Sequence, residues 1–376
     1  MSPIPTHIQA AILPSPTASV AEFLHFPFLS QLPMSSIKQD VHDFWSLEPP
    51  NVSKFTAESL KRLLIPSAAG LSALQEARTP IQEKASIIYA HLPNNIQSRY
   101  PPWILTYWIL VSSLREHAKA LWMQAESFLS TNKTKWRSGE FRTLCQSVQN
   151  SLLCLPWAGN VCGFSENSPT VLLASYLSHN WLSTSHINQQ LNLLRHELLR
   201  IGKQQYEILQ TDFFTKIGLL HRDRKENNYP AGFKNRHILG VADDLANSTI
   251  RGICGVANVN GNHWVAITVD VIDCQIRYGD SLDGLGTELK AAIQWWIKIH
   301  ISMDLEEASL DITKQTDGFN CGLFALNAVE HFVHPEKHSL LASLSSSCDE
   351  DRLSRFITTC DRDLEMVSWT LFYHPL

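Results

Sequence analysis

The stretch 315–324, Gln-Thr-Asp-Gly-Phe-Asn-Cys-Gly-Leu-Phe, constrains the fold of this chain more than any other part of its sequence. Here a glycine-containing turn leads Cys321 into the apolar run 323–329, which lacks glycine and proline and is typical of a buried helix. We therefore expect Cys321 at a helix N-terminus. Backbone N–H groups and the helix dipole there favour the thiolate, the nucleophilic form of cysteine. Taken alone, however, Cys321 is better explained as a core residue, because free cysteine is often buried.

Two upstream stretches bring a histidine and an aspartate to the ends of predicted strands. His263 opens a β-branched run, and Asp280 follows a short strand predicted at 275–278. Adjacent strands would hold these two side chains together, so that the histidine takes the thiol proton while the aspartate orients the imidazole. Asp283 and Asp317 are rival carboxylates, but Asp280 is the one at a strand end.

The order of these motifs resembles that of the ubiquitin-like-protein protease family, the sentrin/SUMO-specific cysteine proteases that process and remove ubiquitin-like modifiers. The shared pattern is His-Trp, then Asp-Ser, then a glutamine six residues before Cys-Gly. The resemblance implies that Cys321 is the nucleophile, His263 the general base and Asp280 its orienting carboxylate. It also implies that Gln315 donates to the oxyanion. The implied fold is papain-like, of the adenain type, with a mixed sheet and a central nucleophile helix.

A fourth match lies at 181–188, Trp-Leu-Ser-Thr-Ser-His-Ile-Asn, which resembles the family motif Trp-Leu-Asn-Asp-x-x-Ile-Asn. Members of the family clamp the Gly-Gly tail of the modifier between two tryptophans. The matching positions in this sequence are Trp181 and Trp264. The resemblance thus implies a substrate-binding role for both residues, and it covers roughly residues 153–335.

Two positions depart from the family pattern. Ser183 and Thr184 replace an Asn-Asp pair whose acidic residue meets a basic residue on the modifier, and Asn320 stands where an aspartate commonly precedes the nucleophile. The identity of the modifier is therefore open. Three functions remain: an isopeptidase for SUMO or a related modifier, a thiol protease or acyltransferase for another modifier such as ubiquitin, and a module that binds without cleaving. The intact catalytic residues argue against the third.

The chain divides into four predicted segments. They are a proline-rich, partly ordered arm at 1–50, an all-helical accessory domain at 51–148, the protease domain at 149–340 and a helical tail at 341–376. In the accessory domain, a capping box predicts a helix over 79–92, and near-heptad apolar spacing predicts another over about 102–129.

The protease segment mixes strand and helix patterns. Strands are expected at 252–257, 263–271, 275–278 and near 309–313, with a hairpin turn at Asn-Gly-Asn 260–262. Helices are expected after Trp181, over 287–300 and after Cys321, which together define an α+β fold. A last helix is expected within 349–369, and the sequence does not decide on which domain it packs.

Composition excludes several other functions. A net charge of −5 without a basic cluster argues against a nucleic-acid partner, and no apolar stretch is long enough to span a bilayer. The eight cysteines form no Cys-x-x-Cys pair, so we expect free thiols in a reducing compartment, no zinc or other metal site and no cofactor. We expect a soluble intracellular protein whose partners are a ubiquitin-like modifier and its conjugates. The location is the nucleus or the cytoplasm, and only the resemblance favours the nucleus.

Overall fold

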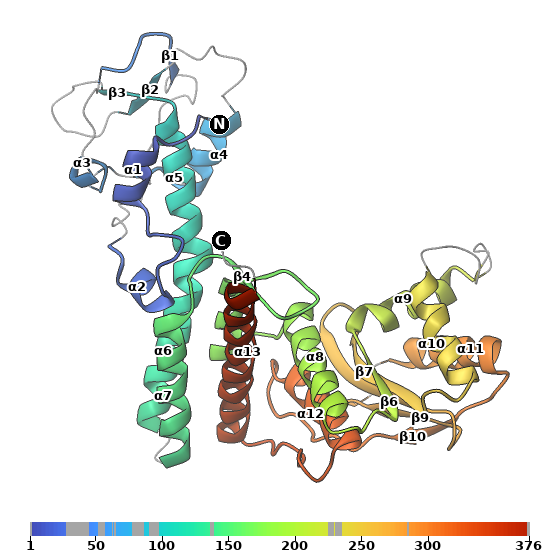
Figure 1. Cartoon of the computed structure of the whole chain (residues 1–376). Helices are drawn as coiled ribbons and strands as arrows, with labels where there is room; N and C mark the ends of the chain where they lie inside the picture. Colours follow the sequence, from blue (N-terminus) through green and yellow to red (C-terminus); the bar gives the residue numbers. More distant parts are fainter. Residues whose placement is uncertain are drawn as a thin grey trace. The chain divides into compact units, whose positions relative to one another are not determined.

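The computed structural model divides the chain into two compact units. It describes residues 2–27, 45–51, 57–61, 63, 65–76, 86–89, 98–135, 139–224, 229, 235–283 and 286–373. One unit comprises Met1–Gln124 and Leu152–Gly159, and the other comprises Ala125–Ser151 and Asn160–Leu376 (Figure 1). Within the described residues, no helix has the length and apolar character needed to cross a membrane.

The first unit combines helices with a small sheet. Its helices are α1 (Thr6–Ile12), α2 (Val20–His25), α3 (Ala57–Lys61), α4 (Ala68–Glu76) and α5 (Trp103–Ser113), followed by the π-helical turn η2 (Leu114–Lys119). Strands β1 (Trp45–Ser46), β2 (Ser86–Tyr89) and β3 (Ser98–Tyr100) form an antiparallel sheet in the order β1-β2-β3. The expectation of an all-helical accessory domain is thus too simple, although helices do precede the protease domain.

The helix expected over 79–92 is replaced, where it is described, by β2. Ile87 is completely buried and pairs with Trp45 on one side and Tyr100 on the other, so sheet pairing and burial override the local helical pattern. The remaining residues of that expected helix lie outside the described residues. The helix expected over 102–129 is longer and consists of α5, η2 and α6 (Ala120–Lys135), after which α7 (Gly139–Cys154) follows.

The second unit contains a mixed five-stranded sheet. Its strands are β6 (Tyr206–Leu209), β7 (Gly252–Val259), β8 (His263–Asp270), β9 (Gln275–Gly279) and β10 (Glu306–Ser309), in the order β10-β9-β8-β7-β6. The central pairs are antiparallel and the two outer pairs are parallel. In the β7–β8 turn, Asn260 and Gly261 have φ of 56° and 75°, as the Asn-Gly sequence predicts.

The last strand lies earlier than the sequence indicates. Instead of 309–313, the paired residues are 306–309, because β10 runs alongside β9 and pairing stops where β9 ends at Gly279. The other three strands predicted for this domain match β7, β8 and β9 to within about two residues.

Helices cover both faces of this sheet (Figure 1). Helices α9 (Thr211–Arg222), α10 (Arg236–Ala246) and α11 (Thr287–Ile301) share one apolar core with alternate residues of β8, including Val265 and Ile267. Helix α12 (Cys321–Val333) packs on β8 and β7, and α8 (Thr184–Arg200) packs on α12. Every residue of β8 is therefore buried. The α+β fold with a mixed sheet and a central helix is confirmed.

The C-terminal helix belongs to this second unit. Helix α13 (Ser345–Tyr373) contacts α12, α8 and the 3-10 segment η3 (Thr170–Leu177), close to the short hairpin of β4 (Asn160–Val161) and β5 (Ser168–Pro169). Arg355 of α13 forms two hydrogen bonds with the Glu330 carboxylate of α12, at 2.7 and 2.8 Å, and both groups are buried. The tail expected at 341–376 therefore packs on the protease fold through a buried ion pair.

Candidate active site

The sheet brings His263 and Asp280 into direct contact. His263 opens β8 and Asp280 follows the end of β9; the imidazole Nε2 lies 2.7 Å from the carboxylate Oδ1, and both side chains are buried. The same Oδ1 accepts the backbone N–H of Leu282 at 2.8 Å. Among the described residues, the other ring nitrogen, Nδ1, has no hydrogen-bond partner. The aspartate therefore orients the imidazole, and Nδ1 can accept a proton.

Cys321 is the first residue of α12, and its side chain is buried. Burial raises the pKa of the Cys321 thiol, whereas backbone N–H groups of Trp264, Gly322 and Cys321 itself act in the opposite direction. Asp317 raises that pKa further. The sequence-based expectation of a thiolate at this helix N-terminus is thus not met, since desolvation outweighs the backbone N–H groups. Attack by this sulfur then requires a base to remove its proton.

Gln315 lies in the turn before the helix and is fixed next to the aspartate. Its Oε1 accepts a hydrogen bond from Ser281 Oγ at 2.6 Å, and Ser281 directly follows Asp280. Its Nε2 donates to the backbone oxygen of Asp317 at 2.8 Å. A side-chain amide nitrogen carries two hydrogens, so one remains to donate to a substrate oxygen.

The two rival carboxylates have other partners. Asp317 Oδ1 accepts the backbone N–H groups of Phe319 and Asn320, each at 2.9 Å, and its Oδ2 accepts Asn320 Nδ2 at 2.8 Å. Asp283 forms an ion pair with Lys314. Asp317 therefore shapes the turn before Cys321, and an aspartate at position 320 would place a second carboxylate against it.

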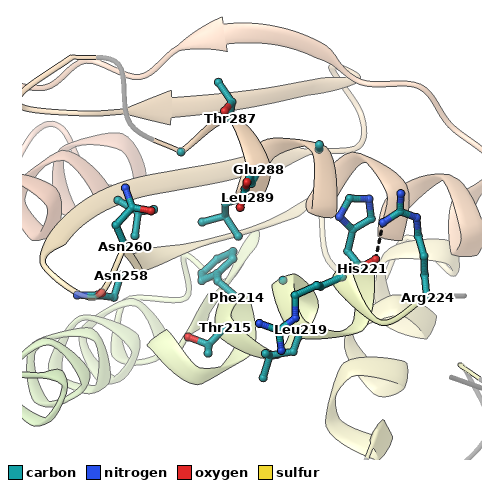
Figure 2. A pocket seen from close by; sticks show the side chains of 15 residues that line it. Phe214, Thr215, Leu219, His221, Arg224, Asn258, Asn260, Thr287, Glu288 and Leu289 are labelled. Carbon is teal, nitrogen blue, oxygen red and sulfur yellow. Dashed lines mark hydrogen bonds between the residues drawn. The ribbon is translucent and has the colours of Figure 1, made fainter. Parts of the chain in front are cut away.

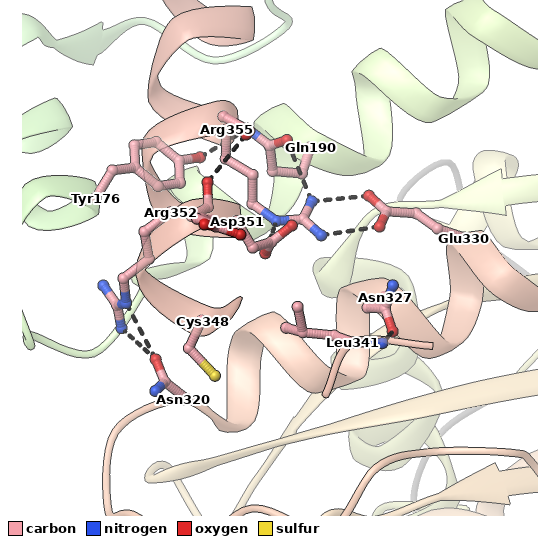
Figure 3. Close-up of polar contacts among 12 residues, drawn as sticks. Tyr176, Gln190, Asn320, Asn327, Glu330, Leu341, Cys348, Asp351, Arg352 and Arg355 are labelled. Atoms are coloured by element: carbon pink, nitrogen blue, oxygen red, sulfur yellow. Dashed lines mark hydrogen bonds and ion pairs between the residues drawn. The ribbon is translucent and has the colours of Figure 1, made fainter. Parts of the chain in front are cut away.

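Arg352 of α13 was not predicted as part of this region. Its Nε and Nη2 donate to Asn320 Oδ1 at 3.0 and 2.9 Å (Figure 3). Further bonds of 3.0 Å reach the backbone oxygens of Ser175 and Asn180. The guanidinium is completely buried and lies 5.7 Å from the Phe319 ring centroid. Burial lowers the pKa of Arg352 to about 10, so the group stays cationic at neutral pH. No local pattern marks it, because its partner is 32 residues upstream.

The two candidate clamp tryptophans each lie against a residue close to Cys321 in the sequence, Trp181 against Gly318 and Trp264 against Gly322. Trp181, half of which is exposed, donates its indole N–H to the backbone oxygen of Gly318 at 2.7 Å. Trp264 is buried and donates to the backbone oxygen of Leu182 at 2.9 Å. A Cβ added to Gly322 would lie only 3.2 Å from Trp264 Cδ1, so glycine permits this close packing. Both indoles thus border the segments next to the cysteine.

The departure from the family motif lies at the start of α8. Ser183 is the N-cap of this helix, and both its backbone N–H and its hydroxyl bond to His186 Nδ1, at 3.1 and 2.7 Å. Burial lowers the pKa of His186 to about 4, so its ring is neutral. Ser183 and Thr184 are exposed and carry no charge, which removes the acidic contact described for the family.

A separate cavity lies between α9, the start of α11 and the β7–β8 turn, with a volume of about 770 Å³. Figure 2 shows Phe214, Asn258 and Glu288 along it, with Arg224 donating to the backbone oxygen of His221 at 2.6 Å. None of the predicted catalytic residues or clamp tryptophans lines this cavity.

Comparison with known proteins defines the class of this domain. The sequence model of the Ulp1 protease family, C-terminal catalytic domain, matches residues 180–359. The domain is therefore a hydrolase of the cysteine-peptidase type. These residues belong to the Ulp1 protease family, which confirms the resemblance seen in the sequence.

Solved structures similar to this chain include members of the same family. The SUMO protease Ulp1 with its catalytic cysteine oxidized to a sulfenic acid is 14% identical, with 60% of this chain and 95% of that chain covered and a TM-score of 0.43. The Ulp1 protease domain in complex with Smt3, the yeast ortholog of SUMO, is 13% identical, with 61% of this chain and 97% of that chain covered and a TM-score of 0.41. The Xanthomonas campestris effector XopD bound to ubiquitin is 17% identical, with 47% of this chain and 91% of that chain covered and a TM-score of 0.35. No curated protein matched the sequence.

Proposed function

We propose that this chain cleaves the bond after the C-terminal Gly-Gly of SUMO or a related ubiquitin-like modifier. The observation that carries the proposal is the 2.7 Å contact between His263 Nε2 and Asp280 Oδ1, which leaves Nδ1 without a hydrogen-bond partner among the described residues. Cys321 begins the helix packed on the strand that His263 opens, and the backbone N–H of Trp264, the next residue on that strand, lowers the pKa of its thiol against the effect of burial. Nucleophile, base and orienting group thus come from three adjoining elements.

The proposed reaction uses the raised thiol pKa as its starting condition. His263 removes the proton of Cys321 as the sulfur attacks the glycine carbonyl, and the imidazolium is stabilised by Asp280. The oxyanion accepts hydrogen bonds from Gln315 Nε2 and the backbone N–H of Cys321. His263 then returns the proton to the departing amine, leaving a thioester. Water, deprotonated by His263, hydrolyses this thioester, releases the modifier's carboxylate and restores the thiol.

Substrate selection follows from the two tryptophans. Trp181 presents an exposed indole beside Gly318, and Trp264 lies beneath the start of α12. We propose that they form a slot that admits only glycine, which selects a Gly-Gly tail by excluding larger side chains. The partners would be the modifier and its conjugates. We also propose that the accessory segment expected at 51–148 supports or targets the protease.

The modifier itself is the open part of this proposal. Exposed, uncharged Ser183 and Thr184 offer no carboxylate to a basic residue of the modifier. A modifier that does not depend on this ion pair, ubiquitin included, is therefore the second candidate. All eight cysteines are free thiols, which supports a reducing location in the nucleus or cytoplasm.

The test is a panel of ubiquitin-like proteins that carry a C-terminal electrophile. Wild type and Cys162→Ala, which removes an exposed thiol, should form a covalent adduct with one member, whereas Cys321→Ala should form none. Peptide mapping should place the adduct on Cys321. A folded wild-type protein that labels with no member, or an adduct that persists in Cys321→Ala, would contradict the proposal.

A further inference from the structure

Three side chains that take no part in the proposed reaction meet at the far end of α12. Glu197 lies near the end of α8, His334 directly follows α12, and His338 lies four residues further on. His334 Nδ1 is 3.1 Å and His338 Nε2 is 3.4 Å from the same oxygen, Glu197 Oε1. One donor atom from each residue lies within 4.8 Å of the other two. All three side chains are largely buried.

These distances suit a tetrahedral zinc ion. Zinc lies about 2.0–2.2 Å from imidazole nitrogen and carboxylate oxygen, so neighbouring ligand atoms in a tetrahedron are roughly 3.4 Å apart. The contacts of His334 and His338 with Glu197 are already close to that separation. Two imidazoles and one carboxylate are a ligand set that zinc and similar divalent transition metals prefer.

The surroundings orient the same three groups. Lys337 Nζ lies 2.5 Å from Glu197 Oε2, which fixes the carboxylate with its other oxygen toward the imidazoles. His334 Nε2 faces Glu336 Oε2 at 3.8 Å, so the nitrogen not used for metal binding has its own carboxylate. Such outer partners are typical of metal-binding histidines and carboxylates. Although it lies 3.4 Å from Glu197 Oε1, the buried His338 Nε2 forms no hydrogen bond with any of the described residues.

We propose that Glu197, His334 and His338 bind a divalent transition metal ion of the zinc type, with water at the fourth position. The ion would replace the proton shared between His334 Nδ1 and Glu197, and it would link the ends of α8 and α12. Helix α12 has 13 residues, so the site lies about 20 Å along the helix from Cys321. At that distance the ion would stabilise the fold and would not take part in the reaction at Cys321. The expectation that the chain has no metal site was based on cysteine spacing. That spacing does not bear on this site, because its ligands are two histidines and a glutamate 137 residues before His334.

The same groups also form an ion-pair cluster without metal, since Lys337 and hydrogen bonding from His334 lower the pKa of Glu197 against the effect of burial. Metal binding distinguishes these two states. The purified full chain is stripped with a chelator, and Zn²⁺ and Co²⁺ are then titrated with calorimetry, metal analysis and visible absorption. These readouts do not depend on peptidase activity.

We expect one ion per chain, a higher unfolding temperature with Zn²⁺, and a Co²⁺ spectrum without a thiolate charge-transfer band. His334→Gln, His338→Gln and Glu197→Gln should each weaken binding at least about a hundred-fold, whereas His196→Gln, which changes an exposed neighbour on α8, should not. Absence of binding by the folded wild type would overturn the proposal. Binding that survives all three substitutions, or a thiolate band, would overturn it as well.

Discussion

Arg352 and Asn320 are joined by two hydrogen bonds, of 3.0 and 2.9 Å, between the guanidinium of the last helix and one amide oxygen. Asn320 is the residue before Cys321, and its amide nitrogen donates to Asp317, which holds the same turn. The last helix thus holds the turn from which α12 starts, through the side chain of Asn320. Its contribution to the site is one of position, since Arg352 is completely buried behind the turn.

Replacing Arg352 tests this positioning role. Arg352→Met leaves three oxygens without this donor, the buried Asn320 Oδ1 and the part-buried backbone oxygens of Ser175 and Asn180, so at about 1 kcal/mol each we expect a loss of roughly 3 kcal/mol in unfolding free energy. Below the unfolding temperature, kcat should fall at least about tenfold with little change in KM. Arg362→Met, on the same helix but partly exposed, is the control. Equal kcat values for wild type and Arg352→Met would show that the contact is structural only.

The buried ion pair between Arg355 and Glu330 should be essential for docking of the last helix. Removing one partner of such a pair leaves an uncompensated buried charge, so Arg355→Met should destabilise the protein by about 3–5 kcal/mol in a denaturant titration. The double variant with Glu330→Gln should recover part of that loss. Lys298→Met, at an exposed pair with Asp304, should change stability by less than about 1 kcal/mol. A similar small effect at Arg355 would contradict the buried-pair interpretation.

A side chain at position 322 should disturb the packing around Cys321. A Cβ at this position would approach Ile187 Cδ1 to 3.1 Å and Trp264 Cδ1 to 3.2 Å, so Gly322→Ala should displace the clamp tryptophan. We expect a stability loss of about 1–2 kcal/mol, and a drop in kcat/KM of about tenfold. Gly240→Ala, on α10 with open space around its Cβ, should be neutral or stabilising. Unchanged kinetics in Gly322→Ala would separate Trp264 from substrate binding.

His186 should make the protein less stable in mild acid. Its pKa is lowered to about 4, so below its ordinary value of 6.5 the unfolded chain binds a proton that the folded chain does not. Its contribution is therefore present above pH 6.5 and is lost as the pH falls toward 4, by roughly 3 kcal/mol in total. Denaturant titrations from pH 7 to 4 should show a weaker pH dependence in His186→Gln. His237→Gln, which changes an exposed histidine, serves as the control. If unfolding free energy depends on pH equally in both variants, His186 is not the source of the pH dependence.

The sequence predicted those features of the site that depend on local pattern. Cys321 begins a helix because a turn precedes an apolar run, and His263 opens a strand after an Asn-Gly turn. Long-range contacts were not predictable in this way. Arg352 reads locally as one charged residue of an amphipathic helix, and Ile87 reads as part of a helix until its two strand partners bury it. The raised pKa of Cys321 likewise depends on how deeply the whole fold buries the sulfur.

The central claim is that Cys321 cleaves after Gly-Gly with His263 and Asp280 as its partners. The most direct measurement is hydrolysis of linear modifier fusions, SUMO and ubiquitin among them, with the product ends identified by mass spectrometry. Wild type and Cys162→Ala should cleave one fusion after Gly-Gly, Asp280→Asn should be slower by about 10³–10⁴-fold, and Cys321→Ala should be inactive. Cleavage by Cys321→Ala at the wild-type rate, or at a site other than Gly-Gly, would contradict the account.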